Sequence, residues 1–231
     1  MSNVSRALSF GWGCTQVSSR TLMISGTDTG IGKTWSAIAL ARAIAETGLS
    51  VSVRKPVESF DPSEGAADSR ILADALGTHP DEVCRPEWSY PLALAPPMAA
   101  AALRRAIPST RRLVEDLGGA QGDVLLVEGV GGPRSPLAAD GDTVDLARAL
   151  GADDVIVVSD ATLGTISRTL LCVEAFAPLP CHVLLNRFDP EEPLHVMNRD
   201  WFIDKAVSVH TDPSTMATIL LRSHNTTLEV R

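Results

Sequence analysis

The sequence predicts an α/β protein with a doubly wound, mostly parallel β-sheet and helices on both faces of that sheet. Short apolar runs that end in glycine, proline or a polar residue recur along the chain, as expected for strands buried on both sides. Segments with helical periodicity lie between them. This alternation favours short crossover connections, which join parallel strands with a fixed hand. The 231 residues, of which 45% are hydrophobic and 21% charged, fit one domain, which we place at residues 21–231.

Composition argues against several functional classes. The formal net charge of −8 disfavours an extended surface for nucleic acid or an acidic membrane. The four cysteines form no C-x-x-C pair, which disfavours a zinc site and favours a reducing, cytoplasmic location. No apolar run approaches the ~18 residues that span a bilayer. Residues 1–20 show no sustained periodicity, and we expect a flexible N-terminal extension there.

The first strand is predicted at residues 22–24, and the loop after it carries the strongest functional signal. Residues 26–34 read G-T-D-T-G-I-G-K-T, a phosphate-binding loop with one extra residue between its outer glycines. Glycines let backbone N–H groups and the next helix N-terminus face an anion, while Lys33 adds a cation and Thr34 a hydroxyl for magnesium. The chain is therefore expected to bind a nucleoside triphosphate.

Lys55 and Pro56 follow the second predicted strand, residues 51–53, which is reached through a helix at residues 35–47 closed by Gly48. The proline takes the chain out of the sheet and delivers the Lys55 side chain to the carboxyl edge, where α/β sheets bind ligands. A lysine at this place can also be a solvated surface charge.

Ser59 and Asp68 lie in the loop before the next predicted helix, residues 71–76. A segment near the phosphates thus carries a lysine, a hydroxyl and a carboxylate. Asp68 can take part in the site, or it can be the N-cap of that helix. The residues alone leave both interpretations open.

Residues 123–128 form a continuous apolar run that ends in Glu128 and leads into a turn containing three glycines. Such a run predicts a buried parallel strand. In phosphate-loop enzymes a carboxylate at the tip of a neighbouring strand holds magnesium opposite the loop hydroxyl, and Glu128 is the candidate for that role. The alternative is a solvent-exposed glutamate before an ordinary glycine turn.

Two further strands are predicted at residues 155–158 and 182–185, with a helix at residues 163–175 between them. Asn186 ends the last strand, where its amide can bind a nucleobase or form a turn. For the tail, residues 189–231, we expect cover for one edge of the sheet, with a contribution to the base pocket as the alternative. A short final helix is predicted at 213–222.

Five segments, taken together and in order, resemble the dethiobiotin synthetase family, whose members use ATP to close the ureido ring late in biotin synthesis. The resemblance covers roughly residues 22–186. The segments are G-T-D-T-G-I-G-K-T at 26–34, K-P-V-E-S at 55–59, P-P-M-A-A-A at 96–101, V-E-G-V-G-G at 127–132 and L-G-T-I-S at 163–167.

The resemblance implies which residues hold each ligand. The nucleotide site would comprise Thr29, Gly30, Ile31, Gly32, Lys33, Thr34, Glu128 and Asn186. The magnesium ion would be held by Thr34, Asp68 and Glu128. The diamine would face Thr29, Lys55, Ser59 and Gly131. The catalytic residues would be Lys33, Lys55 and Thr29.

The implied reaction combines 7,8-diaminopelargonate, carbon dioxide or bicarbonate, and ATP with Mg²⁺. One amine captures carbon dioxide as a carbamate, a carbamate oxygen attacks the γ-phosphate, and the second amine closes the ring and expels phosphate. Because the carbamate and the triphosphate are both anions, two lysines and a metal suit the reaction. Residues 96–101 would help to line the aliphatic chain, or form an ordinary alanine-rich helix. The family also implies a homodimer.

The chain departs from the family pattern at three places. Gly30 stands where many relatives carry an acidic residue, and Ser167 and Arg168 replace an Asn-His pair. No Gly-x-Ile-Pro strand is recognisable after Asn186. Ser167 concerns a contact expected from the partner subunit, and the strand concerns nucleobase selectivity.

Other functional classes share the predicted fold. A partition-type or signalling ATPase switch would carry a second lysine five residues before Lys33, where this chain has Asp28. An amidotransferase-type synthetase would need a glutaminase region, for which the chain is too short. A nucleotide-binding paralogue without ring-closing activity is the third alternative, and the combination of Lys33, Lys55, Ser59 and Glu128 speaks against it.

Overall fold

The computed structural model describes residues 20–228, with side chains placed through residue 221. The predicted N-terminal extension, residues 1–20, lies outside the described residues except for Arg20, with which the first strand begins.

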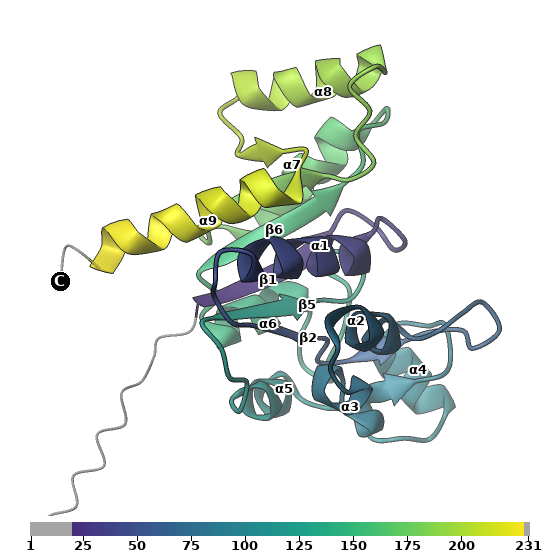
Figure 1. Ribbon diagram of the computed structural model, residues 1–231. Coiled ribbons are helices and arrows are strands. Elements are labelled where there is room, and N and C mark those ends of the chain that lie inside the picture. Colours follow the sequence, from purple (N-terminus) through teal and green to yellow (C-terminus); the bar gives the residue numbers. More distant parts are fainter. Residues whose placement is uncertain (1–19, 229–231) are drawn as a thin grey trace, which may run out of the picture.

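Six parallel strands form the central sheet in the order β2-β5-β1-β6-β7-β8 (Figure 1). They are β1 (Arg20–Gly26), β2 (Val51–Arg54), β5 (Val124–Glu128), β6 (Asp154–Ser159), β7 (Cys181–Leu185) and β8 (Val209–His210). Every ladder of this sheet is parallel. The chain runs from β1 outward to β2, returns through β5, and then crosses β1 to build the other half. The predicted doubly wound parallel sheet is confirmed.

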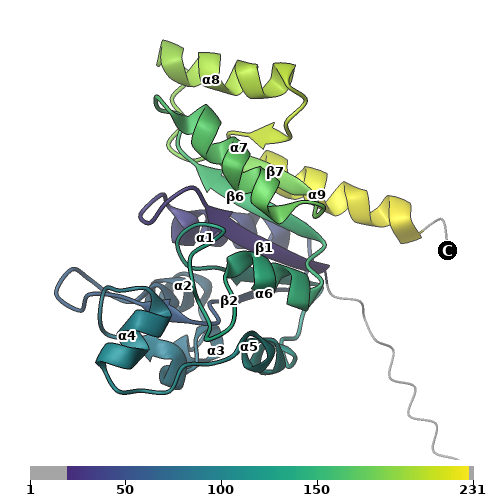
Figure 2. The ribbon, with the colours of Figure 1, turned by 180° about the vertical axis from the view of Figure 1, so that it is seen from behind.

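Helices cover both faces of this sheet. Figure 1 shows α1 and α9 on one face, and Figure 2, seen from behind, shows α6 and α7 on the other. The helices are α1 (Lys33–Ala45), α2 (Asp68–Leu76), α3 (Pro80–Val83), α4 (Pro96–Ala102), α5 (Thr110–Leu117), α6 (Thr143–Leu150), α7 (Thr165–Phe176), α8 (Pro193–Asp204) and α9 (Pro213–Leu228). A small parallel sheet of β3 (Glu58–Ser59) and β4 (Ser89–Tyr90) packs with α4.

The core consists of apolar clusters on the two faces of the sheet. Along β1, Leu22 and Ile24 belong to the cluster that contains Leu40 of α1, whereas Met23 belongs to the opposite cluster with Phe176 of α7. Successive side chains of a strand point to opposite faces. A strand covered on both faces is therefore apolar at every position, which explains the continuous apolar runs in the sequence.

The predicted elements agree with the structure in type and approximate bounds. All five predicted strands are present within two residues of their expected ends. The helix predicted at residues 213–222 starts at Pro213 and continues to Leu228. The helices α3, α5, α6 and α8 and the two-residue strands β3, β4 and β8 were not predicted from the sequence.

The tail extends the sheet at one edge. β8 pairs with β7, α8 packs against α7 and β8, and α9 packs against α1. This confirms that the tail covers an edge of the sheet. Among the helices in the described part of the chain, none is long and apolar enough to cross a membrane.

Candidate active site

The phosphate-binding loop connects β1 to α1 at the carboxyl edge of the sheet. Gly32 is the N-cap of α1 with φ 101°, and no side chain caps the first turn, so its N–H groups remain available to an anion. This positive φ favours glycine, and a Cβ on Gly32 would also lie 2.1 Å from Asn186 Nδ2. Lys33 is buried and donates to the Asp28 carbonyl at 3.0 Å. This arrangement can hold phosphate groups.

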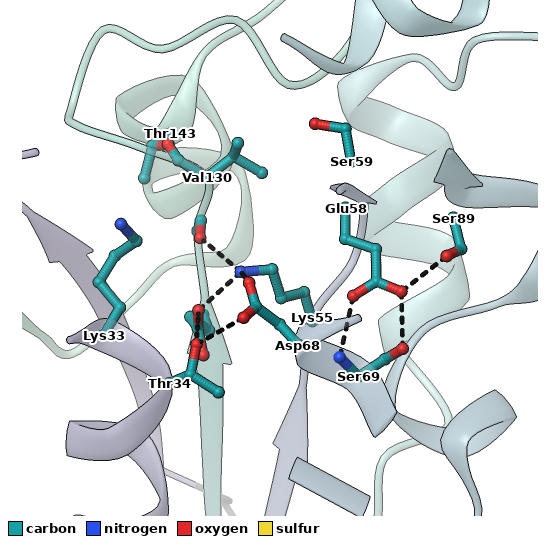
Figure 3. Close-up of polar contacts among 12 residues, drawn as sticks. Lys33, Thr34, Lys55, Glu58, Ser59, Asp68, Ser69, Ser89, Val130 and Thr143 are labelled. Atoms are coloured by element: carbon teal, nitrogen blue, oxygen red, sulfur yellow. Dashed lines mark hydrogen bonds and ion pairs between the residues drawn. The ribbon is translucent and has the colours of Figure 1, made fainter. Parts of the chain in front are cut away.

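Four side chains from separate segments meet beside the loop (Figure 3). Lys55 Nζ lies 2.6 Å from Asp68 Oδ2 and 2.6 Å from Glu128 Oε1. Thr34 Oγ1 lies 2.9 Å from Asp68 Oδ1 and 3.0 Å from Glu128 Oε1. We call these four residues the Lys55 cluster. The structure thus brings together Lys55, one of the two predicted catalytic lysines, and the three predicted metal ligands.

Sheet topology explains this meeting. β5 lies between β1 and β2, and Glu128 at its tip is in register with Ile24 of β1. Lys55 directly follows β2, and Thr34 lies in the first turn of α1. Because parallel strands end at the same edge, residues far apart in the sequence converge there.

Three of the alternative interpretations are wrong. Lys55 is 3% exposed and Glu128 is 0% exposed, so neither is a solvated surface charge. The N-cap of α2 is Ala67, and Asp68 is the first helical residue. Asp68 is therefore not the cap, and its carboxylate is free to contact Thr34 and Lys55.

The charges of the cluster shift the pKa values of its members. Burial alone would lower the pKa of Lys55, but the Glu128 and Asp68 carboxylates raise it well above its usual value. Burial raises the pKa of Glu128, and the Lys55 ammonium opposes that rise. Burial lowers the pKa of Lys33, and the like charge of Lys55 lowers it further. The two lysines are thus close enough to repel each other, and the Asp68 and Glu128 carboxylates offset the charge of Lys55.

The oxygen atoms of Thr34, Asp68 and Glu128 suit a magnesium ion, because Mg²⁺ prefers carboxylate and hydroxyl oxygens. Glu128 Oε2 is buried and has no hydrogen-bond partner among the described residues. A buried carboxylate oxygen without a partner is costly, and a bound cation would satisfy it. The donor set therefore fits the ion that the family resemblance implies.

A cavity of about 510 Å³ opens between the loop and the Lys55 cluster. Predicted site residues in its lining are Thr29, Gly30, Gly32, Lys33, Thr34, Ser59, Asp68, Glu128 and Gly131. The lining does not include Lys55, which contacts Asp68 and Glu128, nor does it include Ile31 or Asn186. Gly131 has φ 55°, and a Cβ there would lie 2.3 Å from Ser135 Oγ.

The apolar wall of this cavity was not predicted from the sequence. The wall consists of Ala93, Leu94, Ala95, Val130 and Pro136. The segment 96–101 is not part of the lining; it forms most of α4, with Ala99 and Ala100 buried and Met98 exposed. The alternative interpretation, an ordinary alanine-rich helix, is the one observed. The Ser59 hydroxyl donates to the Leu94 carbonyl and so orients the wall.

A second cavity, of about 410 Å³, shares Gly32 with the first. Its other lining residues are Trp35, Leu184, Leu185, Asn186, Arg187, Phe188, Thr211 and Pro213. Asn186 Nδ2 donates to the Ile31 carbonyl at 2.9 Å, which ties the loop to the end of β7. Thr211 and Pro213 come from the tail, which thus contributes to this cavity besides covering the edge. They follow β8, so a strand is present after Asn186 although the sequence did not reveal it.

Comparison with known proteins identifies relatives of the chain. A family model described as an AAA domain matches residues 20–198. The ATP-dependent dethiobiotin synthetase of Anaeromyxobacter dehalogenans is 40% identical over 179 residues, which cover 75% of this chain and 79% of that protein. The synthetase of Mycobacterium avium is 40% identical over 178 residues, with 74% and 76% covered.

Solved structures share the fold. A plasmid partition protein from Borrelia burgdorferi superposes with a TM-score of 0.57 at 14% identity, covering 89% of this chain and 99% of that one. A cobyrinic acid a,c-diamide synthase from Mycobacterium smegmatis, solved with an ATP analogue and magnesium, gives 0.51 at 16% identity, covering 90% and 96%. At such identities these structures show the fold alone, whereas the closer sequence relatives show the family. The chain belongs to the dethiobiotin synthetase family of ATP-dependent ligases.

Proposed function

We propose that this protein converts 7,8-diaminopelargonate, carbon dioxide and ATP into dethiobiotin, ADP and phosphate, with Mg²⁺ as cofactor. The observation that carries the proposal is Lys55, a buried second lysine held 2.6 Å from two carboxylates of the predicted metal site. A nucleotide switch needs the loop lysine and the metal ligands. A second lysine beside them serves a second anion, as a carbamate is.

The loop binds the triphosphate in this proposal. The N-terminus of α1, its uncapped N–H groups and Lys33 together offer positive charge to the phosphates. Magnesium, held by Thr34, Asp68 and Glu128, would offset the charge that develops on the transferred phosphoryl group. The second cavity, with Asn186 at its rim, is proposed to take the nucleobase.

The diamine is proposed to bind in the first cavity. Its aliphatic chain would lie against the apolar wall formed by Ala93, Leu94 and Val130, because burial removes apolar surface from water. Thr29, Ser59 and Gly131 provide polar groups in the same lining. The two amines would then face the loop, where the phosphates bind.

The proposed chemistry proceeds in three steps. An amine nitrogen attacks the carbon of carbon dioxide, giving a carbamate and releasing a proton to solvent. A carbamate oxygen attacks the γ-phosphorus, and ADP leaves. The second amine nitrogen attacks the carbamate carbon, loses a proton, and expels phosphate as the ring closes. Lys33 and Lys55 act by charge and position rather than as bases, since both bring anions together.

Two further features are proposed for this chain: a homodimer, which the family resemblance implies, and a cytoplasmic location, which the cysteine pattern favours. Ser167, at the place where a partner contact is expected, is exposed on α7. Light scattering on the purified protein tests the dimer directly.

The test of the function is an incubation of the protein with 7,8-diaminopelargonate, bicarbonate, Mg²⁺ and ATP, with dethiobiotin measured by mass spectrometry. The reaction is repeated with other nucleoside triphosphates and with Lys33→Ala. We expect product that requires both the nucleotide and Lys33. Triphosphate binding without product under any of these conditions would overturn the proposal and favour a switch or a non-catalytic paralogue.

A further inference from the structure

Glu58 is a buried carboxylate for which the proposed reaction has no role. It lies beside the Lys55 cluster on the short strand β3 (Figure 3). Glu58 is 1% exposed, and within the described residues it forms no ion pair with a lysine or arginine. A buried carboxylate is costly unless its oxygens accept hydrogen bonds. Its hydrogen-bond partners therefore show what holds it in place.

Three donors satisfy Glu58, and two of them belong to one residue. Oε2 accepts the Ser69 backbone N–H at 2.9 Å, and Oε1 accepts the Ser69 hydroxyl at 2.6 Å. Oε1 also accepts the Ser89 hydroxyl at 2.7 Å. Glu58 thus accepts hydrogen bonds from the backbone and the side chain of Ser69, and a third hydrogen bond links it to Ser89 of β4.

These hydrogen bonds stabilise the first turn of α2. Its N-cap, Ala67, has no side chain that can accept a hydrogen bond from the first turn, and helix N-termini leave such N–H groups unsatisfied. Glu58 lies ten residues before Asp68, on β3, and supplies the missing acceptor. Its negative charge is also favourable at the positive end of the helix.

Asp68 directly precedes Ser69 and needs such support. Its side chain is 41% exposed, whereas that of Glu128 is 0% exposed. Packing therefore fixes Glu128, but the direction of the Asp68 carboxylate depends on the backbone at the start of α2. A hydrogen bond to the next residue along that backbone restricts it directly.

Glu58 also links this helix to the rest of the site. It lies on the segment that carries Lys55 and Ser59, and it is in register with Ser89 of β4. One side chain thereby joins the segment of Lys55 to the helix of Asp68. The relative position of these two segments therefore determines the distance of 2.6 Å between Lys55 Nζ and Asp68 Oδ2.

We propose that Glu58 is a positioning residue that holds the first turn of α2 so that Asp68 faces Thr34 and Lys55. The inference rests on the proposed function, because the metal role of Asp68 gives its position a chemical consequence. Residues that orient metal ligands typically change metal affinity by 10–100-fold when they are removed.

The test measures metal binding directly, with Mn²⁺ as the probe in the presence of a non-hydrolysable ATP analogue. Free Mn²⁺ is quantified by electron paramagnetic resonance. We expect Glu58→Ala to raise the Mn²⁺ dissociation constant about tenfold. Hydrogen exchange at the start of α2 should also become faster, since the Ser69 amide loses its acceptor.

Glu58→Gln is the rescue variant. Its amide oxygen can accept the Ser69 N–H, and its NH₂ group can donate to the two serine hydroxyls, which can also act as acceptors. We expect Mn²⁺ affinity and the exchange rate to return most of the way to those of the unaltered protein. A role based on charge alone would show no such recovery.

Asp140 offers a matched control. Its carboxylate accepts the N–H of Thr110 at 2.7 Å and the hydroxyl of Thr110 at 2.9 Å, at the first residue of α5. Asp140→Ala removes the same two kinds of hydrogen bond from a helix that carries no predicted metal ligand. We expect the Mn²⁺ dissociation constant to stay within about twofold of its original value.

The outcomes separate the two proposals. If the unaltered protein does not bind Mn²⁺ with the analogue, the metal part of the proposed function fails, and the positioning role fails with it. If it binds and a folded Glu58→Ala protein binds equally well, the positioning role alone is overturned, as it is if Asp140→Ala weakens binding equally. Should Glu58→Ala not fold, Ser89→Ala removes a single donor, and unchanged affinity in that variant overturns the proposal.

Discussion

Buried ion pairs lie at both edges of the central sheet, but only the carboxyl-edge pairs adjoin the first cavity. At the carboxyl edge, Lys55 pairs with Asp68 and Glu128 beside the cavity of about 510 Å³. At the amino edge, Arg20 at the start of β1 pairs with Asp154 at the start of β6. At each edge a buried cation therefore pairs with a buried carboxylate, Lys55 with Glu128 and Arg20 with Asp154.

The amino-edge network connects elements rather than lining a site. Asp154 Oδ1 lies 3.1 Å from His182 Nε2, and His182 Nδ1 lies 2.8 Å from Ser208 Oγ. Ser208 Oγ also lies 3.1 Å from His210 Nε2. Arg20 donates a further hydrogen bond to a carbonyl of α9. None of these residues lines either cavity described above.

The comparison teaches that burial and charge do not by themselves distinguish function from structure. Both networks contain a basic residue between elements that the fold brings together. At the amino edge the carboxylate is used to hold strands and the tail in place. At the carboxyl edge, Asp68 and Glu128 line a cavity. Access to a ligand separates the two.

The largest expected effect is that of Lys55→Ala on ring closure. Loss of this charge should lower product formation by about 10³-fold or more, because the positive charge facing the developing anions is removed. Nucleotide affinity should change only a few-fold, since Lys33 and the loop remain. Mass spectrometry of product and calorimetry of nucleotide binding measure the two quantities. Near-normal product formation would remove Lys55 from the mechanism.

Asp154→Ala should strongly lower stability but not catalysis. It leaves the buried Arg20 without its ion-pair partner, and breaking a buried pair in this way costs about 3–5 kcal/mol of unfolding free energy. Urea unfolding measures that loss. The catalytic efficiency of the protein that remains folded should stay close to its original value. A fall in efficiency as large as that of Lys55→Ala would contradict the functional separation of the two edges.

Glu128→Gln should change the metal dependence of the reaction. The amide keeps the shape of the side chain but loses its negative charge, so the Mg²⁺ concentration for half-maximal rate should rise about tenfold or more. The rate is measured against Mg²⁺ concentration at saturating ATP. An unaltered profile would exclude Glu128 from the metal site.

The smallest expected effect is the pH dependence of stability at the amino edge. Burial lowers the pKa of His210, and the neighbouring His182 lowers it further. The unfolded chain then binds more protons than the folded one, so stability falls as the pH drops below about 6.5, the unperturbed value. Urea midpoints at pH 7.5 and 5.5 measure this fall, and it should be smaller in His210→Gln. An equal fall in the variant would assign the effect to other groups.

Much of the fold and of the site was predictable because the signals are local. The loop at residues 26–34 carries its chemistry in adjacent residues, and the buried strands are apolar at every position. The strands β3, β4 and β8 were not predictable, since two residues have no periodicity. The role of Asp68 was also undecided, because a carboxylate before a helix looks the same whether it caps the helix or faces a metal.

The sequence alone determined the parallel α/β architecture, the phosphate-binding loop and the set of charged residues at the carboxyl edge, since these follow from residue type and short-range pattern. Tertiary structure alone decided which charges meet. It placed Lys55 between Asp68 and Glu128, assembled the apolar wall of the cavity, and set Glu58 against Ser69. The reason is physical: these contacts join segments whose separation in the chain is bridged only when the sheet and its helices pack together.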